Sequence, residues 1–486
     1  MSFREKTAAL FERWAALLRR EGVSFQEKKS FLTREIHVAP WIMTLLFGFS
    51  FFWVLFIELG LEKESVTNVS LLVAIILFFV TDTIRRFYPE VTRSEEKITF
   101  LGFISLFTFL LMEFIKIHHY SRYIIPVPLA VILIQMLLSP GMALLTGFTL
   151  SLILSLIYNF DFALFLISFS LSLVALFSTS RVTNRNALMR AGFLVTLSEI
   201  FFIYTLSLFT GLSFIRGFSL FGVSLATGLG CSILVLGILP FIENFFDLVS
   251  DIRLLELSDF NQPLLKRLIS EAPGTYHHSL LVASLAENAA FPVGANPILT
   301  RVGSYYHDIG KLYKPDYFIE NTLQAHTRHK GLNPKISGMV ITGHVKEGIH
   351  LSEIHKLPTD IKNFISQHHG TSLMHYFYFK ALEKKEQEST PEEFRYPGPR
   401  PQNKEVALVM LADSVEAAVR SLEKPSFERM KDMVQKVINN KFIDGQLDEC
   451  PLTLKDLHHI NDSFIHTMTK IYHARIEYPE EEKEGE

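Results

Sequence analysis

Residues 302–311 read VGSYYHDIGK, and the pair His307-Asp308 in this stretch decides how the second half of the chain is interpreted. Apolar and aromatic side chains recur around the pair at helical spacing, which predicts that it lies on a helix. Imidazole nitrogens and carboxylate oxygens are ligands for ions such as Mn, Fe or Zn. The stretch therefore predicts a metal site inside a helical domain.

Other ligand-type residues follow the same pattern, each within a mainly apolar segment with helical spacing. Eleven of the eighteen histidines fall between His277 and His375. Metal sites in helical bundles are built from inward-facing side chains on facing helices. Unrelated core histidines are the alternative, but they do not explain a His-Asp pair followed by a double His and a buried-type Asp. The candidate ligands are His278, His307, Asp308, His344, His368, His369 and Asp413.

The composition places a membrane-embedded part in the first half of the chain. Of 486 residues 49% are hydrophobic, and 43 are Phe, which is too apolar for an ordinary soluble protein. The net charge of −3 argues against a nucleic-acid polymer as partner. Cys231 and Cys450 are too far apart to indicate a disulfide framework or a CxxC zinc site.

Eight segments are apolar enough to be candidate membrane spans, which need roughly 20 residues as helices. Two of them are separated only by Ser139-Pro140-Gly141, which favours either a tight hairpin or one long kinked element. Positive residues mark cytoplasmic loops, and their distribution places both the N-terminus and everything after residue 245 inside. The predicted spans are 39–59, 67–84, 98–117, 122–139, 141–158, 161–179, 191–212 and 218–243.

Five regions result from this division. The charged N-terminus lacks an early apolar run with a cleavage site, so we interpret it as an amphipathic cytoplasmic segment and not as a signal peptide. The regions are 1–37 (amphipathic segment), 38–245 (about eight spans), 246–272 (helical linker), 273–478 (ligand-bearing domain) and 479–486 (acidic tail).

Three charged residues, Glu113, Lys116 and Glu199, lie in or near the predicted spans. Intramembrane charges can mark a ligand or ion pathway. They can also be interfacial or paired inside the bundle, and the sequence favours this second interpretation.

An ordered set of motifs gives the ligand-bearing domain a family resemblance: PGTYHHS at 273–279, HDIGK at 307–311, QHHG at 367–370 and LADSVEA at 411–417. Together with the membrane segments, the chain resembles the bacterial seven-transmembrane HD-domain phosphodiesterases that hydrolyse cyclic di-AMP. The resemblance covers roughly residues 67–478 and implies an all-α protein, with a polytopic transmembrane bundle followed by a soluble all-helical HD phosphohydrolase domain. It also implies a multi-pass protein of the bacterial cell (inner) membrane, with N-terminus and HD domain cytoplasmic.

One feature departs from the resemblance. Members of this family usually carry a large extracellular domain between the first span and the seven that follow. Here the corresponding gap is residues 61–66, which is too short for a domain. The resemblance therefore supports catalysis better than extracellular sensing.

The resemblance and the ligand types together imply two divalent metal ions, Mn or Fe in the first place. His278, His307 and Asp413 would hold one ion, His344, His368 and His369 the other, and Asp308 would bridge them. Such a pair can activate a shared water for in-line attack on phosphorus, which would give linear pApA. Asp308 and Lys311 are the predicted catalytic residues; Lys311 would contact a phosphate oxygen, with a solvated surface lysine as the alternative.

Substrate contacts are predicted at His277, Lys311, His326 and Tyr306, and the loop YPGPRP at 396–401 either covers the site or is a plain connector. The predicted partners are a cyclic dinucleotide and the lipid bilayer, and a homodimer is left open. Two other functions stay open: an HD hydrolase of an alarmone or a nucleoside triphosphate, and a non-catalytic nucleotide-binding membrane receptor. The three additional histidines His344, His368 and His369 argue against a mononuclear HD enzyme.

Overall fold

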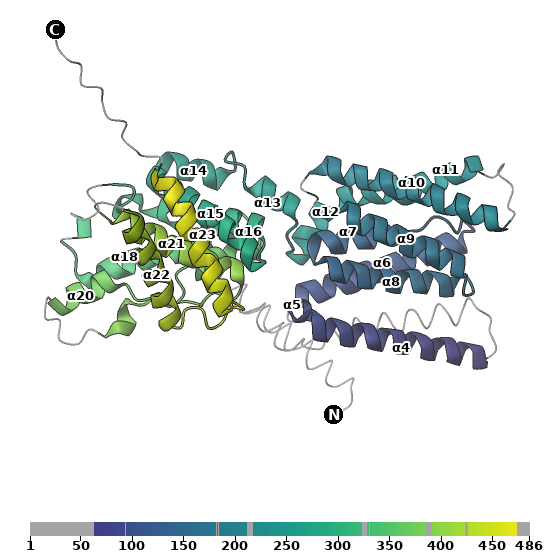
Figure 1. The fold of residues 1–486 in the computed structure, drawn as a ribbon, viewed down its shortest axis with the longest axis horizontal. Coiled ribbons are helices and arrows are strands. Elements are labelled where there is room, and N and C mark those ends of the chain that lie inside the picture. The colour runs from purple at the N-terminus through teal and green to yellow at the C-terminus, as the bar shows by residue number, and fades with distance from the viewer. Residues whose placement is uncertain are drawn as a thin grey trace, which may run out of the picture. The chain divides into compact units, whose positions relative to one another are not determined.

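The computed structural model describes residues 63–473 apart from 93, 181, 183, 211–216, 323–327, 330, 384–389 and 423–425. All regular elements among these residues are helices, and an isolated β-bridge pairs Leu373 with Arg395. The predicted all-α fold is confirmed. The chain divides into two compact units between Phe246 and Asp247, whose helices are labelled in Figure 1. The predicted segments 1–37, 39–59 and 479–486 lie outside the described residues.

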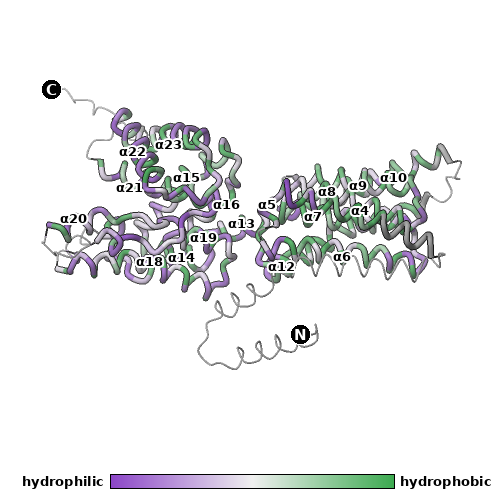
Figure 2. The backbone as a smooth tube through the Cα atoms, turned by 90° about the horizontal axis from the view of Figure 1, so that it is seen from below, coloured by the Kyte–Doolittle hydropathy of each residue, from purple (hydrophilic) through white to green (hydrophobic). Residues whose placement is uncertain are grey.

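The first unit is a bundle of apolar helices. Within its described part, four helical runs are long and apolar enough to cross a membrane: Glu95–Ile117, Pro140–Ile157, Arg185–Leu206 and Leu220–Phe246. Figure 2 shows hydrophobic residues along most of the unit. Its elements are α4 (Lys63–Phe87), α5 (Pro89–Thr92), α6 (Glu95–Ile117), α7 (Val127–Leu137), α8 (Pro140–Ile157), α9 (Phe162–Ser178), α10 (Arg185–Thr210), α11 (Gly217–Leu225), the π-helix η2 (Ala226–Gly230) and α12 (Cys231–Phe246).

The seven predicted spans from residue 67 onward each overlap a helix or a helical run, but one of them is shorter than predicted. The segment 122–139 is helical only from Val127 to Leu137, because Pro126 and Pro128 lack the amide protons that a helix interior requires. This helix, α7, packs against α8, α9 and α12, and most of its side chains are buried. Leu138 and Ser139 separate α7 from α8, and the two helices pack against each other, so the hairpin alternative is the one observed.

The second unit is also helical and contains two hydrophobic cores. One core joins residues of α15, α21, α22 and α23, and the other joins residues of α13, α14, α16, η3 and α19. The helices are α13 (Asp251–Leu257), α14 (Pro263–Glu271), α15 (Pro273–Val293), α16 (Pro297–Tyr306), α18 (Pro334–Ile354), α19 (Thr359–Gln367), α20 (His375–Glu383), α21 (Lys404–Arg420), α22 (Phe427–Ile443) and α23 (Leu454–His473), with short 3₁₀ turns η3 (Ile309–Tyr313), η4 (Pro315–Tyr317) and η5 (Pro391–Phe394).

Proline and asparagine define where several helices of the second unit begin. Pro297 and Pro334 occupy first-turn positions, where a missing amide proton costs nothing. Asn296, Asn333 and Asn403 precede their helices, and each side chain accepts a hydrogen bond from a first-turn amide. These residues define the first residues of α16, α18 and α21.

The segment 246–272, predicted as a helical linker, is helical and forms α13 and α14. Their leucines are buried in the same core as Val302 and Ile309. They therefore belong to the body of the second unit.

Candidate metal centre

Asp308 is the centre of the cluster, and its two carboxylate oxygens face different sets of histidines. Oδ2 lies 3.2 Å from His307 Nε2 and 3.7 Å from His278 Nε2. Oδ1 lies 3.4 Å from His344 Nε2 and 3.7 Å from His368 Nε2. All five side chains are buried. A single carboxylate is thus shared by two groups of imidazoles.

Asp413 and His369 complete the cluster. Asp413 Oδ1 lies 3.0 Å from His278 Nε2, and Asp413 Oδ2 lies 3.6 Å from His369 Nδ1. The ligand atoms form two groups within which they lie close enough to hold an ion: His278, His307 and Asp308, and Asp308, His344, His368 and His369. The structure therefore brings all seven sequence-predicted ligands together, with Asp308 in both groups.

Five segments deliver these seven ligands. His278 is on α15, His344 on α18 and Asp413 on α21, while His307 and Asp308 follow the last residue of α16. His368 and His369 follow the last residue of α19. The predicted helix around the His-Asp pair is correct up to Tyr306, after which the chain turns into η3.

Gly310 explains why Asp308 can approach His344. A Cβ atom at this position would lie 1.8 Å from the backbone oxygen of His344 and 2.5 Å from the nitrogen of Gly348. Only glycine allows η3 to pack this closely against α18. The glycine of HDIGK thus holds the bridging carboxylate against the histidine of the second group.

Four histidines have their Nδ1 atoms held by hydrogen bonds. Nδ1 of His307 donates to Ser304 O at 2.7 Å, Nδ1 of His344 to Ile341 O at 2.6 Å, and Nδ1 of His368 to Phe364 O at 2.9 Å. Because carbonyl oxygens only accept, Nδ1 of these three rings carries the proton and the Nε2 lone pair faces the cluster, as metal ligation requires. Nδ1 of His278 donates to Glu416 Oε2 at 2.6 Å.

Several polar atoms at the centre lack a hydrogen-bond partner among the described residues: His278 Nε2, His307 Nε2 and Asp308 Oδ1. Buried polar atoms without partners are rare and call for an explanation. All three point at positions where an ion would satisfy them. The residues present therefore fit divalent metal ions with nitrogen and oxygen ligands.

Electrostatics keep most of the ligand set ready for an ion. Burial lowers the pKa of His368 to about 3, and burial together with His368 lowers the pKa of His369 well below its usual value. Both rings are therefore neutral at physiological pH. Burial would raise the pKa of Asp308, but the charges of Lys311 and His307 lower it well below its ordinary range. Asp308 is therefore ionised.

His278 behaves differently. Burial lowers its pKa, but the neighbouring carboxylates of Asp413 and Glu416 outweigh burial and raise it to about 9. Without an ion, this ring is protonated between two carboxylates. A metal ion at His278 must displace that proton.

Lys311 lies inside the cluster and not on the surface. Its Nζ atom is 2.7 Å from Asp308 Oδ2 and 2.7 Å from Glu320 Oε1, and the side chain is 12% exposed. The ammonium group also lies 5.0 Å from the centroid of the Phe318 ring. The alternative of a solvated lysine is thus wrong.

Two of the other predicted substrate contacts, His277 and Tyr306, are not brought to the cluster. His277 is exposed, and its ring lies beside Tyr276. Tyr306 is a core residue and is 1% exposed. Its hydroxyl group donates to Leu257 O at 2.8 Å. His326 lies outside the described residues.

Three residues of the site were missed as site residues. Glu416 binds His278 Nδ1 and is 2% exposed; it could have been found, since it lies three residues after Asp413 on one helical face. Glu320 forms an ion pair with Lys311, and no pattern in the local sequence predicts this contact. The Tyr396 ring stacks on His369 with centroids 4.1 Å apart, which places the start of the loop 396–401 against the site.

A groove of about 330 Å³ opens beside His344. Its wall combines apolar side chains with the cation of Lys314 and the carboxylate of Glu347. The lining residues are Gly310, Tyr313, Lys314, Phe318, Ile336, Met339, Val340, Gly343, His344 and Glu347. The groove thus shares Gly310 and His344 with the metal centre.

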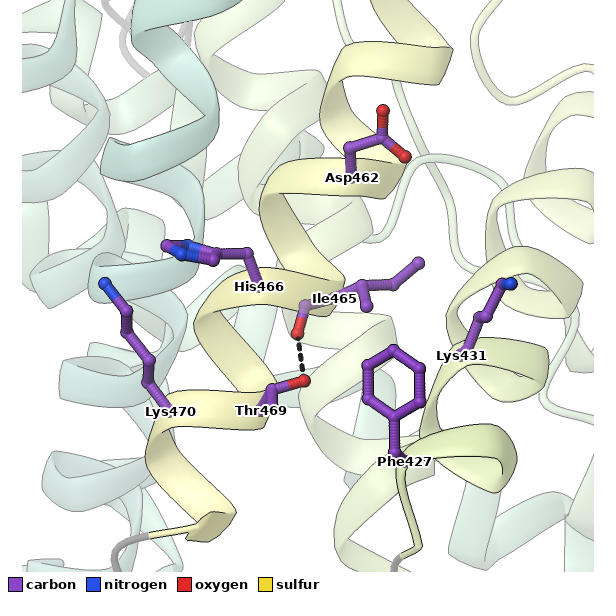
Figure 3. A pocket seen from close by; sticks show the side chains of 7 residues that line it. All are labelled: Phe427, Lys431, Asp462, Ile465, His466, Thr469 and Lys470. Carbon is purple, nitrogen blue, oxygen red and sulfur yellow. Dashed lines mark hydrogen bonds between the residues drawn. The ribbon is translucent and has the colours of Figure 1, made fainter.

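A second depression of about 390 Å³ lies between α22 and α23, and Figure 3 shows its lining side chains. Lys431 and Lys470 come from different helices, and Thr469 donates to Ile465 O within α23. None of the seven candidate ligands lines this depression. The groove beside His344 is therefore the one associated with the centre.

Comparison with known proteins agrees with this arrangement. Residues 65–250 match the family model described as "7TM receptor with intracellular HD hydrolase", and residues 275–418 match the HD domain. The chain belongs to the 7TM-HD family. The family resemblance drawn from the motifs is confirmed.

Two curated relatives of this 7TM-HD chain are named cyclic-di-AMP phosphodiesterase PgpH. The protein of Bacillus subtilis (strain 168) is 37% identical over 402 residues, which cover 80% of this chain and 56% of the relative. That of Listeria monocytogenes serotype 1/2a (strain 10403S) is 36% identical over 423 residues, covering 84% and 58%. The chain thus spans less than two thirds of the length of these relatives.

A solved structure, the HD domain of L. monocytogenes PgpH in complex with cyclic di-AMP, is 44% identical to this chain. It covers 45% of this chain and 100% of the solved chain, with a TM-score of 0.42.

Proposed function

We propose that the second unit is a metal-dependent phosphodiesterase that hydrolyses a cyclic dinucleotide, cyclic di-AMP in the first place, to linear pApA. Its catalytic domain would lie within residues 273–478. The observation that carries the proposal is the position of Asp308, whose two oxygens face two different groups of imidazoles. The names of the two PgpH relatives support the choice of substrate.

Two divalent ions are proposed to occupy the cluster. His278, His307 and Asp413 would hold one ion, His344, His368 and His369 the other, and Asp308 would bridge them. The donors are imidazoles and carboxylates without a thiolate, which suits Mn or Fe as well as Zn; we propose Mn or Fe. When bound, such a pair lowers the pKa of water and neutralises charge on phosphoryl oxygens.

The chain's own residues would position the substrate. Lys311 carries a positive charge at the edge of the centre, held by Asp308 and Glu320, and is proposed to meet a non-bridging phosphate oxygen. The groove beside His344 offers apolar walls of a size that suits a nucleobase. Stacking by Tyr396 covers one face of His369 and limits how this ring can turn.

Each protein chain carries all seven proposed ligands, so catalysis would not require a second copy. We also propose that the chain is a multi-pass protein of the bacterial cell membrane with its N-terminus and its second unit in the cytoplasm. Positive residues, which mark cytoplasmic segments, gather in residues 1–37, 85–97 and 181–190. A fusion of alkaline phosphatase to the C-terminus should then be inactive, whereas a fluorescent protein at the same place should fold. Phosphatase activity of the C-terminal fusion would reverse this orientation.

The test is hydrolysis by the detergent-solubilised chain supplied with Mn, using cyclic di-AMP, cyclic di-GMP, an alarmone and a nucleoside triphosphate. Asp308→Ala should lower the rate of hydrolysis by about 10³-fold or more, because both metal groups lose their shared ligand. Asp316→Ala is a matched control, since Asp316 pairs with Arg328 in an exposed turn.

Three results would contradict parts of the proposal. Equal inertness of the wild type and Asp308→Ala on every substrate would remove the enzyme. Preferential cleavage of cyclic di-GMP would remove the adenine assignment alone. Full activity with a single bound ion would remove the binuclear centre.

A further inference from the structure

Glu199 is a buried carboxyl group of the first unit without a hydrogen-bond partner among the described residues. It lies on α10, within a run that is long and apolar enough to cross a membrane. The residue is 0% exposed, and neither Oε1 nor Oε2 makes a hydrogen bond. Burying such a group without a partner is costly, and intramembrane acids of this kind mark functional sites. The sequence favours an interfacial or paired charge at Glu199, but among the described residues no ion pair with Glu199 is found.

Buried hydroxyl groups surround this carboxyl. Ser224 on α11 and Thr227 on η2 lie beside it, and both are almost completely buried. Thr196, one turn earlier on α10, contacts the same segment, because its hydroxyl lies 3.2 Å from Ser224 O. The polar groups thus come from three neighbouring elements, α10, α11 and η2, in a mainly apolar bundle.

The threonine hydroxyl protons are directed away from Glu199. Thr227 donates to Tyr123 O at 3.1 Å and accepts from Ile125 N at 3.1 Å, which leaves one lone pair on its oxygen. The Thr196 proton is taken by the backbone oxygens of Gly192 and Ser224. Ser224 Oγ has no hydrogen-bond partner in the described part of the chain. These oxygens therefore offer lone pairs, which is what a cation requires.

The backbone around the carboxyl is locally irregular and tightly packed. Residues Ala226–Gly230 form a π-helical turn, a form that is rare and frequent at functional sites. A Cβ atom on Gly228 would lie 2.4 Å from Gly192 O and 2.5 Å from Thr196 N. The two backbones are therefore in direct contact one turn before Glu199 on α10.

We propose that Glu199, Ser224 and Thr227 form a binding site for one monovalent alkali cation inside the membrane unit. A monovalent cation matches the single carboxylate, whereas a divalent ion would leave an uncompensated charge in an apolar interior. Carboxylate and hydroxyl oxygens are hard ligands suited to such an ion. The site is separate from the metal centre of the second unit and does not depend on the proposed hydrolysis.

The test measures binding of radiolabelled sodium and rubidium to the full chain in lipid nanodiscs, with ionic strength held constant by N-methylglucamine chloride. Wild type should bind at least one of the two cations saturably. Glu199→Gln, which keeps the shape and removes the charge, should weaken this binding by about tenfold or more. Ser224→Ala keeps the carboxylate and should weaken it by about fivefold.

Thr108→Val is the matched control, because Thr108 is a buried hydroxyl on α6 that donates only to Ile104 O in its own helix. It should bind like wild type. The proposal is overturned if wild type shows no saturable binding of either cation, or if Ser224→Ala and a folded Glu199→Gln both bind as wild type does. In that case the carboxyl is simply protonated.

Discussion

A histidine binds a metal through one ring nitrogen, and a hydrogen bond from its other nitrogen selects the tautomer and orients the ring. Here three backbone carbonyl oxygens hold the Nδ1 protons of His307, His344 and His368. His278 differs, because its acceptor is the carboxylate of Glu416. A negative charge at this place makes the ring a stronger ligand and orients it at the same time.

Glu416 can be tested by substitution. We expect Glu416→Ala to lower the affinity for the metal ion proposed at His278, His307 and Asp413 by about 10–100-fold, since residues that orient a ligand typically contribute this much. Glu416→Gln should fall between this variant and wild type. Metal retained after dialysis against a graded chelator measures the effect, with Glu428→Ala, an exposed residue of α22, as the control. Unchanged retention in Glu416→Ala would show that the contact does not support the ion.

The raised pKa of His278 predicts a pH dependence of metal binding. In the metal-free chain this ring, with a pKa of about 9, carries a proton that the ion must displace. Affinity should therefore rise with pH, by up to about tenfold per unit, and level off as the pH passes about 9. Calorimetry in buffers of different ionisation enthalpy would report the released proton. An affinity that does not change between about pH 7 and pH 9 would contradict this prediction.

Lys311 allows a prediction about catalysis at the same scale. Lys311→Met should lower kcat/KM by about 10–100-fold, because a point charge near the phosphate is lost while apolar contact with Phe318 is kept. The two metal groups should still bind ions. Lys380→Met, whose ammonium group lies over the Tyr376 ring on α20, is the matched control. Loss of both ions in Lys311→Met would assign Lys311 to folding of the centre instead.

The ligand-type residues singled out from sequence lie together in the structure; they could be singled out because metal ligation restricts the candidates to a few types of side chain. His278 lies in this cluster, whereas His277, predicted as a substrate contact, is exposed. Tyr306 was misassigned because a buried aromatic ring looks alike in a core and in a binding site until its hydroxyl partner, Leu257 O, is known. Glu320 depends on a contact between separate turns, which no local pattern encodes.

At the scale of elements, the close approach of η3 to α18 is the feature most sensitive to a small change. Gly310→Ala would place a methyl group 1.8 Å from His344 O, so the two elements must separate. We expect a loss of about 3 kcal/mol in the free energy of unfolding, together with weaker metal binding. Denaturation of a fragment spanning residues 247–486, with and without Mn, would measure both.

Gly343 on α18 provides the matched control for this prediction. A Cβ atom added there meets nothing within 4 Å. Gly343→Ala should therefore be neutral or stabilise the helix by about 0.5–1 kcal/mol. Equal stability of both variants would show that η3 and α18 can separate without cost.

Hydropathy located the helices of the first unit but not their irregularities. The segment 122–139 is apolar throughout, yet Pro126 and Pro128 start the helix only at Val127. The run 218–243 looks uniform, yet it contains the π-helical turn at 226–230. The late start of α7 comes from the missing amide protons of the prolines, and the π-helical turn from a local change in backbone hydrogen bonding. Neither feature changes the hydropathy of its segment.

For the whole molecule, the two units predict different behaviour toward a bilayer. The full chain should stay in the membrane fraction after washing with high salt or alkaline carbonate and leave it only with detergent, because apolar helices are held by the hydrocarbon core. A fragment spanning residues 247–486 should remain in the supernatant. Release of the full chain by carbonate would contradict a membrane-spanning first unit.

The carboxylate of Asp308 also links the two proposed ions thermodynamically. Oδ2 faces His307 and His278 while Oδ1 of the same rigid group faces His344 and His368, so an ion at one oxygen would orient the other. Each of the two proposed ions would therefore change the affinity for the other. The proposed enzyme would then respond to the cellular supply of its metal with a steepness different from that of a solitary site.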